Sequence, residues 1–333
     1  MKAAVLTAFG SPLEIRELDT PEPTDEEALV RVRATGVCAT DLKVASGALP
    51  HVQVPLVLGH EVAGELVEPA VGLSAGQRVA CYLHSCCGRC RYCRLERPTL
   101  CINAERIGVE RNGGMAEYMT LPAANLLPFG RSLAFAEAAV TMDAVMTPWR
   151  ALKSRAALQP DETVAVVGAG GLGLNAVQIV VDSGARAAVV EPDAEHREQA
   201  VALGADLAVS PEDVAAVRDW ASGGVDVALD TSGARAGFDS AVACLRPGGR
   251  LLCCGYSPTV EYGLDSAELV LSEITIMGSR AGRLADARQA LAAVEEGRIH
   301  PPIMEEMALD EANLALDRLR EGTAVGRQVL HTG

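Results

Sequence analysis

The pattern of apolar and polar residues divides the chain into two regions. Up to about residue 148, short strand-like runs such as residues 29–34 and 62–68 are separated by many prolines and glycines. This pattern predicts β-strands joined by loops. Helical periodicity first appears at residues 134–146. The first region is therefore expected to be rich in β-structure.

Beyond this point, apolar runs become continuous. These runs lie at residues 163–167, 187–190, 207–209, 225–230, 250–254 and 274–278. Helical segments are predicted between most of them. Strands that are apolar throughout are buried on both faces, as in a parallel sheet. Six such strands predict an α/β fold whose second region is a doubly wound nucleotide-binding domain.

The last part of the chain carries a predicted helix at residues 284–296 and a predicted strand at residues 328–331. We expect this segment to return to the first region. The expected organisation has three parts, 1–148, 149–280 and 281–333, with no internal repeat or low-complexity tract.

Composition excludes several classes of protein. The 333 residues include 29 Lys and Arg and 44 Asp and Glu, so the formal charge is −15. A nucleic-acid partner, which favours a basic face, is not expected. The N-terminal apolar run is interrupted by Gly10, Pro12 and Glu14, and no later run reaches the roughly 18 apolar residues of a membrane span. We therefore expect a cytoplasmic protein without a membrane partner, whose 10 cysteines are reduced thiols or metal ligands.

A cluster of cysteines is the strongest local signal. Two residues separate Cys87 from Cys90 and Cys90 from Cys93, and seven separate Cys93 from Cys101. Four thiolates at this spacing predict a tetrahedral structural zinc site, in a lobe at residues 86–101. Because four ligands close the coordination sphere, this site has no position for a substrate.

A glycine-rich turn follows the first continuous strand and opens a helix. It contains Gly168, Gly170, Gly171, Leu172 and Gly173. Glu191 follows 18 residues after the last glycine. This context fits the dinucleotide-binding fingerprint, in which glycines allow a tight turn and a close approach of the pyrophosphate. A carboxylate at Glu191 would accept hydrogen bonds from the adenosine ribose and repel a 2′-phosphate. NAD is therefore expected rather than NADP, although Arg197, close by, leaves NADP open.

Cys38 and His60 are candidate ligands of a second zinc ion. A catalytic zinc ion needs three protein ligands and one open position. Taken alone, each residue is more consistent with a buried thiol or a core histidine. Their position ahead of a four-cysteine cluster and a nucleotide turn in the same chain favours ligation.

Several motifs in order resemble the zinc-dependent medium-chain dehydrogenase/reductase superfamily, in its alcohol dehydrogenase-like group. They are GVCATDLK (36–43), LGHEVAG (58–64), the cysteine lobe, RNGGMAEY (111–118), GAGGLG (168–173), LRPGGR (245–250) and GRQVL (326–330). The resemblance covers nearly the whole chain. It implies a β-rich GroES-like catalytic domain at 1–148, an NAD-binding Rossmann domain at 149–280, and a C-terminal segment that returns to the catalytic domain.

The same resemblance implies roles for single residues. Cys38 and His60 match the first two catalytic zinc ligands. Thr40 matches the hydroxyl that hydrogen-bonds the substrate oxygen and passes its proton outward. Thr147 matches a residue near the nicotinamide carboxamide, and Arg327 matches a cationic partner of the pyrophosphate.

The third catalytic ligand departs from the commonest pattern of the family. Asp143 stands where a cysteine is usual, and its carboxylate carries the same charge as a thiolate and binds zinc at about 2.0–2.2 Å. Glu61 matches a carboxylate close to the metal. In one alternative, Asp143 lies outside the ligand set and Glu61 or water replaces it; in another, zinc binding at this site is weak.

The expected activity is hydride transfer between a zinc-bound alcohol, secondary or cyclic, and NAD(P), with the ketone as the other substrate. One alternative within the superfamily is reduction of a conjugated C=C or iminium bond. Another is a catalytically silent NAD-binding protein, which would not need Cys38, Thr40 and His60 together. By analogy with the family, we expect a homotetramer or homodimer in which residues 274–277 pair across an interface.

Overall fold

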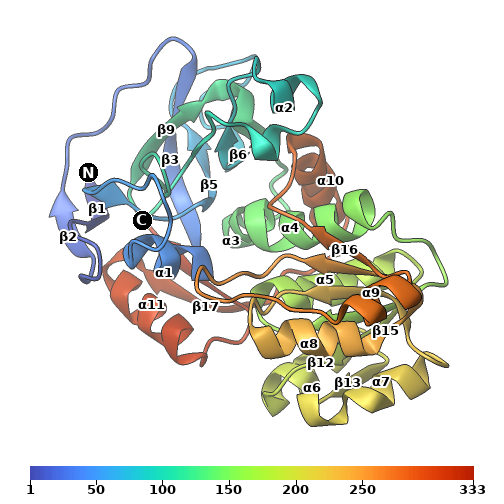
Figure 1. Ribbon diagram of the computed structural model, residues 1–333. Helices are drawn as coiled ribbons and strands as arrows, with labels where there is room; N and C mark the ends of the chain where they lie inside the picture. Colours follow the sequence, from blue (N-terminus) through green and yellow to red (C-terminus); the bar gives the residue numbers. More distant parts are fainter. The chain divides into compact units, whose positions relative to one another are not determined.

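The computed structural model describes all 333 residues, and they form two compact units (Figure 1). Unit 1 consists of residues Met1–Ala144, Arg283–Gly297 and Ile303–Gly333. Unit 2 consists of residues Val145–Gly282 and Arg298–Pro302.

Unit 1 is built on a seven-stranded sheet. Its order is β10 (Leu126–Pro128), β6 (Arg78–Cys81), β5 (Glu61–Leu66), β3 (Glu27–Val37), β18 (Arg327–His331) and β17 (Ile303–Ala308), and β9 (Tyr118–Pro122) also pairs with β3. Along the first eight of the eleven residues of β3, buried side chains alternate with more exposed ones, so one face is buried. The last strand, β18, pairs antiparallel with β3, with Gln328 opposite Val37. The chain end therefore lies beside the strand that leads into Cys38.

Smaller elements complete unit 1. A three-stranded sheet has the order β2 (Glu14–Glu17), β1 (Lys2–Leu6) and β4 (Leu56–Val57), and β7 (His84–Ser85) pairs with β8 (Glu105–Arg106). The helices are α1 (Ala39–Ala45), α2 (Arg91–Arg94), α3 (Phe135–Val140), α10 (Leu284–Glu295) and α11 (Ala312–Glu321).

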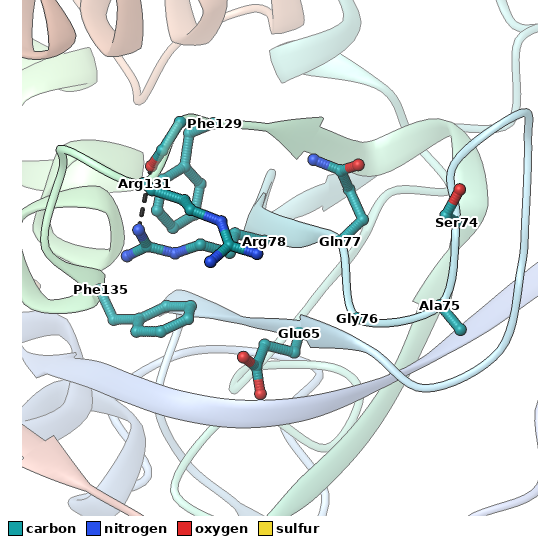
Figure 2. Close-up of a pocket in the computed structure, with 10 residues that line it drawn as sticks. Glu65, Ser74, Ala75, Gly76, Gln77, Arg78, Phe129, Arg131 and Phe135 are labelled. Atoms are coloured by element: carbon teal, nitrogen blue, oxygen red, sulfur yellow. Dashed lines mark hydrogen bonds between the residues drawn. The ribbon is translucent and has the colours of Figure 1, made fainter.

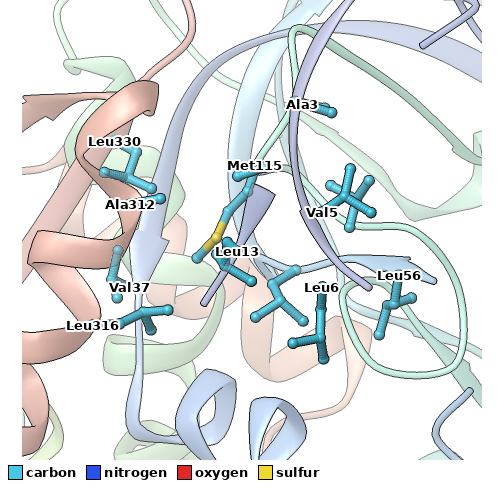
Figure 3. Close-up of a cluster of buried hydrophobic side chains, with 14 of the residues drawn as sticks. Ala3, Val5, Leu6, Leu13, Val37, Leu56, Met115, Ala312, Leu316 and Leu330 are labelled. Carbon is cyan, nitrogen blue, oxygen red and sulfur yellow. The ribbon is translucent and has the colours of Figure 1, made fainter. Parts of the chain in front are cut away.

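The core between β1, α11 and the seven-stranded sheet is made of small aliphatic side chains (Figure 3). Leu6, Met115, Ala312 and Leu330 have no exposed surface. Full burial of a Leu or Met side chain is worth about 1.5–3 kcal/mol. Since aromatic residues make up only 3% of the chain, close packing of Ala, Val and Leu supplies this core.

The predicted helix at residues 134–146 is present but irregular. After α3, residues Thr141–Val145 form a π-helical turn, and the chain stays helical through α4 (Met146–Trp149) and a second π-helical segment, Arg150–Arg155. A π-helical turn inserts one extra residue and changes the direction of the side chains that follow, which is why such turns are frequent at functional sites. Asp143 lies in the middle of the first one.

Unit 2 is a six-stranded parallel sheet. Its order is β13 (Leu207–Val209), β12 (Arg186–Val190), β11 (Thr163–Val167), β14 (Val225–Asp230), β15 (Leu245–Cys253) and β16 (Thr275–Gly278). The helices are α5 (Gly171–Asp182), α6 (Ala194–Ala202), α7 (Val214–Trp220), α8 (Arg235–Cys244) and α9 (Ser266–Leu271). The prediction of a doubly wound α/β sheet is confirmed. The strand order reverses at β11, the point at which such sheets bind ligands.

Among the strands of the parallel sheet, β15 differs most from its predicted bounds. The sequence predicts a strand at 250–254, whereas β15 begins at Leu245 and ends at Cys253. Leu245 pairs with Val225, and a register shift follows before Arg250 pairs with Val227. The Pro-Gly-Gly sequence at 247–249 in this bulge interrupts the apolar pattern, so the pattern does not indicate that pairing begins at Leu245. No helix in the chain is long and apolar enough to cross a membrane.

Candidate active site

Four potential metal ligands converge in unit 1. The ligand atoms of Cys38, His60, Glu61 and Asp143 all lie within 4.8 Å of one another. Cys38 immediately precedes α1, His60 immediately precedes β5, Glu61 is the first residue of β5, and Asp143 comes from the π-helical turn. The Asp143 Oδ2 atom is 3.6 Å from the Cys38 Sγ atom and 3.9 Å from the His60 Nε2 atom.

The donor set fits a zinc ion. His60 is buried, and its Nε2 atom has no hydrogen-bond partner. A buried nitrogen without a partner is costly unless another group binds it. Imidazole nitrogen, thiolate sulfur and carboxylate oxygen are the three donor types that zinc uses in proteins. The structure therefore brings together Cys38, His60 and Asp143 in a suitable arrangement.

Asp41 orients two of these ligands, a role that the sequence reasoning missed. Its Oδ2 atom accepts the backbone N–H of Cys38 at 2.8 Å, and its Oδ1 atom is 3.1 Å from the Nδ1 atom of His60. The Asp41 side chain is fully buried. A carboxylate on Nδ1 favours the tautomer whose lone pair is on Nε2, which is the atom facing the cluster. Its position three residues after Cys38, at the start of a helix, is the local signal that indicates a capping role.

Arg327 lies within the same cluster. It forms a 2.8 Å salt bridge with the buried Glu61, and its Nη2 atom is 3.4 Å from the Cys38 Sγ atom and 3.5 Å from the Asp143 Oδ2 atom. The cation thus balances part of the negative charge of the ligands. Burial raises the pKa of Glu61 to about 7 even though Arg327 lowers it. A role for Arg327 at the pyrophosphate stays a prediction.

Burial and charge act in opposite directions on His60. Burial lowers its pKa, but the negative charge of Asp41 and the nearby side chains of Asp143 and Cys38 raise it well above the ordinary value. Without metal, these neighbours therefore favour the protonated form of His60. Thr40 lies half-buried in the first turn of α1, one residue before Asp41, and its relay role stays a prediction.

The four cysteines of the lobe also converge. The Sγ atoms of Cys90 and Cys93 are 3.6 Å apart, those of Cys87 and Cys101 are 3.5 Å apart, and all four lie within 4.8 Å of one another. Backbone N–H groups of Arg89 and Cys90 lower the pKa of Cys87 to about 6, which favours the thiolate that binds metal.

Cys86 lies outside this set. Its thiol donates a hydrogen bond to the Pro98 carbonyl at 3.3 Å, and burial raises its pKa to about 11.

The glycine turn lies in unit 2, at the carboxyl end of β11. Gly168 has a positive φ of 89°, and a Cβ atom at Gly173 would lie 1.8 Å from the Gly168 oxygen. A Cβ atom at Gly170 would instead meet nothing within 4 Å. The tight turn and the close helix–strand contact therefore require two of the glycines, while Gly170 borders open space that suits a pyrophosphate.

The other predicted nucleotide-binding residues lie at different points of unit 2. Gly171 and Leu172 begin α5, whose first N–H groups have no partner within the helix. Glu191 follows β12 directly and is buried. Thr147 is buried in α4.

A separate hollow in unit 1 contains none of the predicted site residues (Figure 2). The Arg78 guanidinium group lies over the rings of Phe129 and Phe135, 4.7 Å and 4.2 Å from their centroids. It also donates hydrogen bonds to the carbonyls of Gly130 and Leu133. These contacts stabilise the segment that leads into α3.

Comparison with known proteins agrees with this geometry. Residues 24–131 match the family described as alcohol dehydrogenase GroES-like domain, and residues 171–296 match the family described as zinc-binding dehydrogenase. The fold and the two clusters of potential metal ligands thus define a zinc-binding oxidoreductase. The chain belongs to the zinc-dependent medium-chain dehydrogenase/reductase superfamily, in its alcohol dehydrogenase-like group.

Individual relatives align over their full length. The chain is 37% identical to an alcohol dehydrogenase of Geobacillus stearothermophilus, over 99% of each chain. It is 32% identical to the alcohol dehydrogenase of Aeropyrum pernix, whose crystal structure superimposes with a TM-score of 0.92 over 99% of this chain and 100% of the other. It is also 31% identical to an acryloyl-coenzyme A reductase of Metallosphaera sedula, over 100% of both chains. The predictions of fold, family and zinc binding are confirmed.

Proposed function

We propose that this alcohol dehydrogenase-like enzyme interconverts secondary or cyclic alcohols and ketones with NAD as the cofactor. The observation that carries the proposal is the convergence of Cys38, His60 and Asp143 around the buried Nε2 atom of His60, which has no hydrogen-bond partner. Three ligands from the protein leave one position for a substrate oxygen, which distinguishes this cluster from the closed four-cysteine site.

The chemistry divides between the bound groups and the side chains. Zinc supplies a Lewis acid that lowers the pKa of an alcohol, and NAD supplies the hydride acceptor. Asp41 keeps the His60 ring in the orientation that presents Nε2. The Thr40 hydroxyl accepts the proton of the substrate and releases its own proton outward. Arg327 limits the negative charge of the cluster through its salt bridge with Glu61.

Asp143 is proposed as the third zinc ligand. Its Oδ2 atom is 3.6 Å from the Cys38 Sγ atom and 3.9 Å from the His60 Nε2 atom. Arg327 contacts both carboxylates but lies closer to Glu61, at 2.8 Å, than to Asp143, at 3.5 Å. The test is the zinc content per subunit of Asp143→Ala, Asp143→Cys and Glu61→Gln. We expect Asp143→Ala to lose one zinc per subunit, and we expect Asp143→Cys and Glu61→Gln to retain both. Loss only in Glu61→Gln would assign the ligand to Glu61.

The activity is tested by steady-state kinetics. We expect oxidation of secondary and cyclic alcohols with NAD⁺ at a higher kcat/KM than with NADP⁺, because Glu191 repels a 2′-phosphate. Cys38→Ser should lose one zinc and nearly all activity. Full alcohol oxidation by metal-free Cys38→Ser protein would overturn the proposal.

A second candidate function is reduction of a conjugated C=C bond. It is favoured by the acryloyl-coenzyme A reductase relative, 31% identical over the full length of both chains. Such a reduction does not need a Lewis acid at Cys38 and His60. NADH-dependent reduction of an enoyl thioester that survives in Cys38→Ser, with no alcohol oxidation by the wild type, would favour it. A protein that binds NAD and turns over neither substrate class would be the silent alternative.

The assembly is proposed to be a homodimer, or a homotetramer that contains it, formed through β16. This strand is the edge of the parallel sheet, and Ile276 on it is 40% exposed. On α9, Val270 and Leu271 are 67% and 83% exposed. An unpaired edge with apolar neighbours is suited to pair with the same edge of a second copy. Ile276→Lys should lower the mass measured by sedimentation, and an unchanged mass would refute this interface. We also propose a cytoplasmic location, which cell fractionation would test.

A further inference from the structure

The carboxylate of Glu191 is held by the backbone on both sides. Its Oε2 atom accepts the N–H of Ala169, in the glycine turn, at 2.6 Å, and its Oε1 atom accepts the N–H of Asp193 at 3.0 Å. The side chain is 10% exposed. An ionised carboxylate has about four acceptor sites, so two remain for ribose hydroxyls. The direction of this carboxylate therefore depends on the backbone at residues 191–193.

Arg197 determines the course of that backbone. Its Nη1 atom donates hydrogen bonds to the carbonyl of Glu191 at 2.8 Å and to the carbonyl of Pro192 at 2.7 Å. Its own N–H donates to the carbonyl of Asp193 at 3.2 Å in the first turn of α6. One guanidinium nitrogen thus joins two consecutive carbonyls at the point where the chain turns from β12 into α6.

The charge of Arg197 is also partly balanced within the segment. The pKa of Asp193 is lowered first by the N–H of His196, and the positive charge of Arg197 adds to this effect. The His196 Nδ1 atom lies 3.8 Å from the Glu191 Oε1 atom. The arginine that the sequence offers as a ligand of a 2′-phosphate is therefore engaged in the structure of the turn.

We propose that Arg197 is a positioning residue that establishes the preference for NAD, by holding the turn that presents Glu191, and that it is not a ligand of a 2′-phosphate. The inference rests on the proposed dinucleotide site and deepens it. With the turn held, the carboxylate lies at the carboxyl end of β12, where the adenosine ribose binds in this fold. The ribose diol then gains two charge-assisted hydrogen bonds, whereas a 2′-phosphate meets a negative charge. Without Arg197 the turn relaxes, so Glu191 attracts the ribose hydroxyls less and repels a 2′-phosphate less.

The two possible roles of Arg197 predict opposite results. The test measures binding of ADP-ribose and of 2′-phospho-ADP-ribose by calorimetry, since these probes differ only in the 2′-phosphate and do not require turnover. The variants are Arg197→Ala, Arg197→Lys and, as a matched control, Arg186→Ala. Arg186 starts β12 at the opposite end and lies 4.5 Å over the Trp220 ring. Its replacement by Ala removes the same positive charge, but Arg186 makes no contact with the turn at residues 191–193.

Arg197→Ala is expected to weaken ADP-ribose binding about tenfold, equivalent to about 1.4 kcal/mol, and to leave binding of the 2′-phosphate probe unchanged or tighter. Arg197→Lys should recover most of the loss, because an ammonium group also donates to carbonyls. Arg186→Ala should leave the ratio of the two affinities unchanged.

The inference would be overturned if Arg197→Ala lost affinity only for 2′-phospho-ADP-ribose. An unchanged ratio of the two affinities would also overturn it. A wild-type protein that binds neither probe would refute the proposed dinucleotide site itself. A general loss of folding would weaken binding of both probes equally, so the ratio is compared only in variants whose melting temperature matches that of the wild type.

Discussion

Replacement of Asp41 by Asn tests whether this residue determines the affinity of the proposed catalytic zinc site. The carboxylate accepts from the Cys38 N–H at 2.8 Å and faces the His60 Nδ1 atom at 3.1 Å. An amide has only one oxygen, so it can satisfy only one of these partners as an acceptor. If the oxygen keeps the Cys38 contact, the NH₂ group donates to Nδ1. That contact favours the tautomer with hydrogen on Nε2, the atom needed by the metal.

The size of the effect follows from the one hydrogen-bond acceptor that the Asn side chain lacks. When metal is bound at Nε2, the hydrogen of the ring is on Nδ1 and faces the NH₂ group, so this hydrogen bond is lost at a fully buried position, which costs about 1–3 kcal/mol. Loss of a carboxylate that orients a metal-binding histidine lowers metal affinity about 10- to 100-fold, or about 1.4–2.7 kcal/mol. The two figures agree, so we expect zinc affinity at Cys38, His60 and Asp143 to fall by a factor in this range.

The assay is competition with a chromophoric zinc chelator, followed by metal analysis per subunit. The four-cysteine cluster is the internal reference, because Asp41 contributes no ligand atom to it. The matched control is Asp286→Asn. Asp286 is also fully buried and accepts the Arg283 N–H at 2.8 Å at the start of α10, but it has no part in the metal cluster. It should lose stability and keep both metals. Equal zinc loss in both variants, or unchanged zinc affinity in Asp41→Asn, would refute the reasoning.

Three further outcomes are expected. The Cys90→Ser variant should lose one zinc and have a lower melting temperature, while the remaining zinc still supports activity at low temperature. Metal analysis and calorimetry check this. Loss of the zinc at Cys38 and His60 instead would contradict it. Gly170→Ala should fold normally and weaken ADP-ribose binding about tenfold or more, because its Cβ atom projects into the open space where the pyrophosphate is expected. Gly173→Ala should instead destabilise the fold, because its Cβ atom would lie 1.8 Å from the Gly168 oxygen. Equal melting temperatures of the two variants would contradict this difference. In chelator-treated protein, the raised pKa of Glu61 adds stability that is fully present below about pH 4.5 and is lost as the pH rises through about 7. The melting temperature of the wild type relative to Glu61→Gln should therefore fall between pH 5 and pH 8, and a pH-independent difference would contradict this.

Prediction from the sequence succeeded where the signal is local. The spacing of Cys87, Cys90, Cys93 and Cys101 lies within a short segment, so chain connectivity alone brings the thiols close enough to share an ion. The continuous apolar runs predict buried parallel strands because both faces of each strand must be covered. The prediction of β15 was inexact, because pairing of Leu245 with Val225 depends on a neighbouring strand and not on local pattern.

The sequence by itself determined the family, the doubly wound sheet, the four-cysteine cluster and the glycine turn, since each depends on residues adjacent in the chain or on several motifs in order. Only the tertiary structure decided how the catalytic cluster is supported. Arg327 meets Glu61 across 266 residues and Asp143 across 184. Such contacts are made by sheet pairing, which brings β18 beside β3, and by the π-helical turn that directs Asp143. Asp41 and Arg197 acquire their roles in the same way, because the partners of a buried hydrogen bond are fixed by packing and not by the identity of the residue.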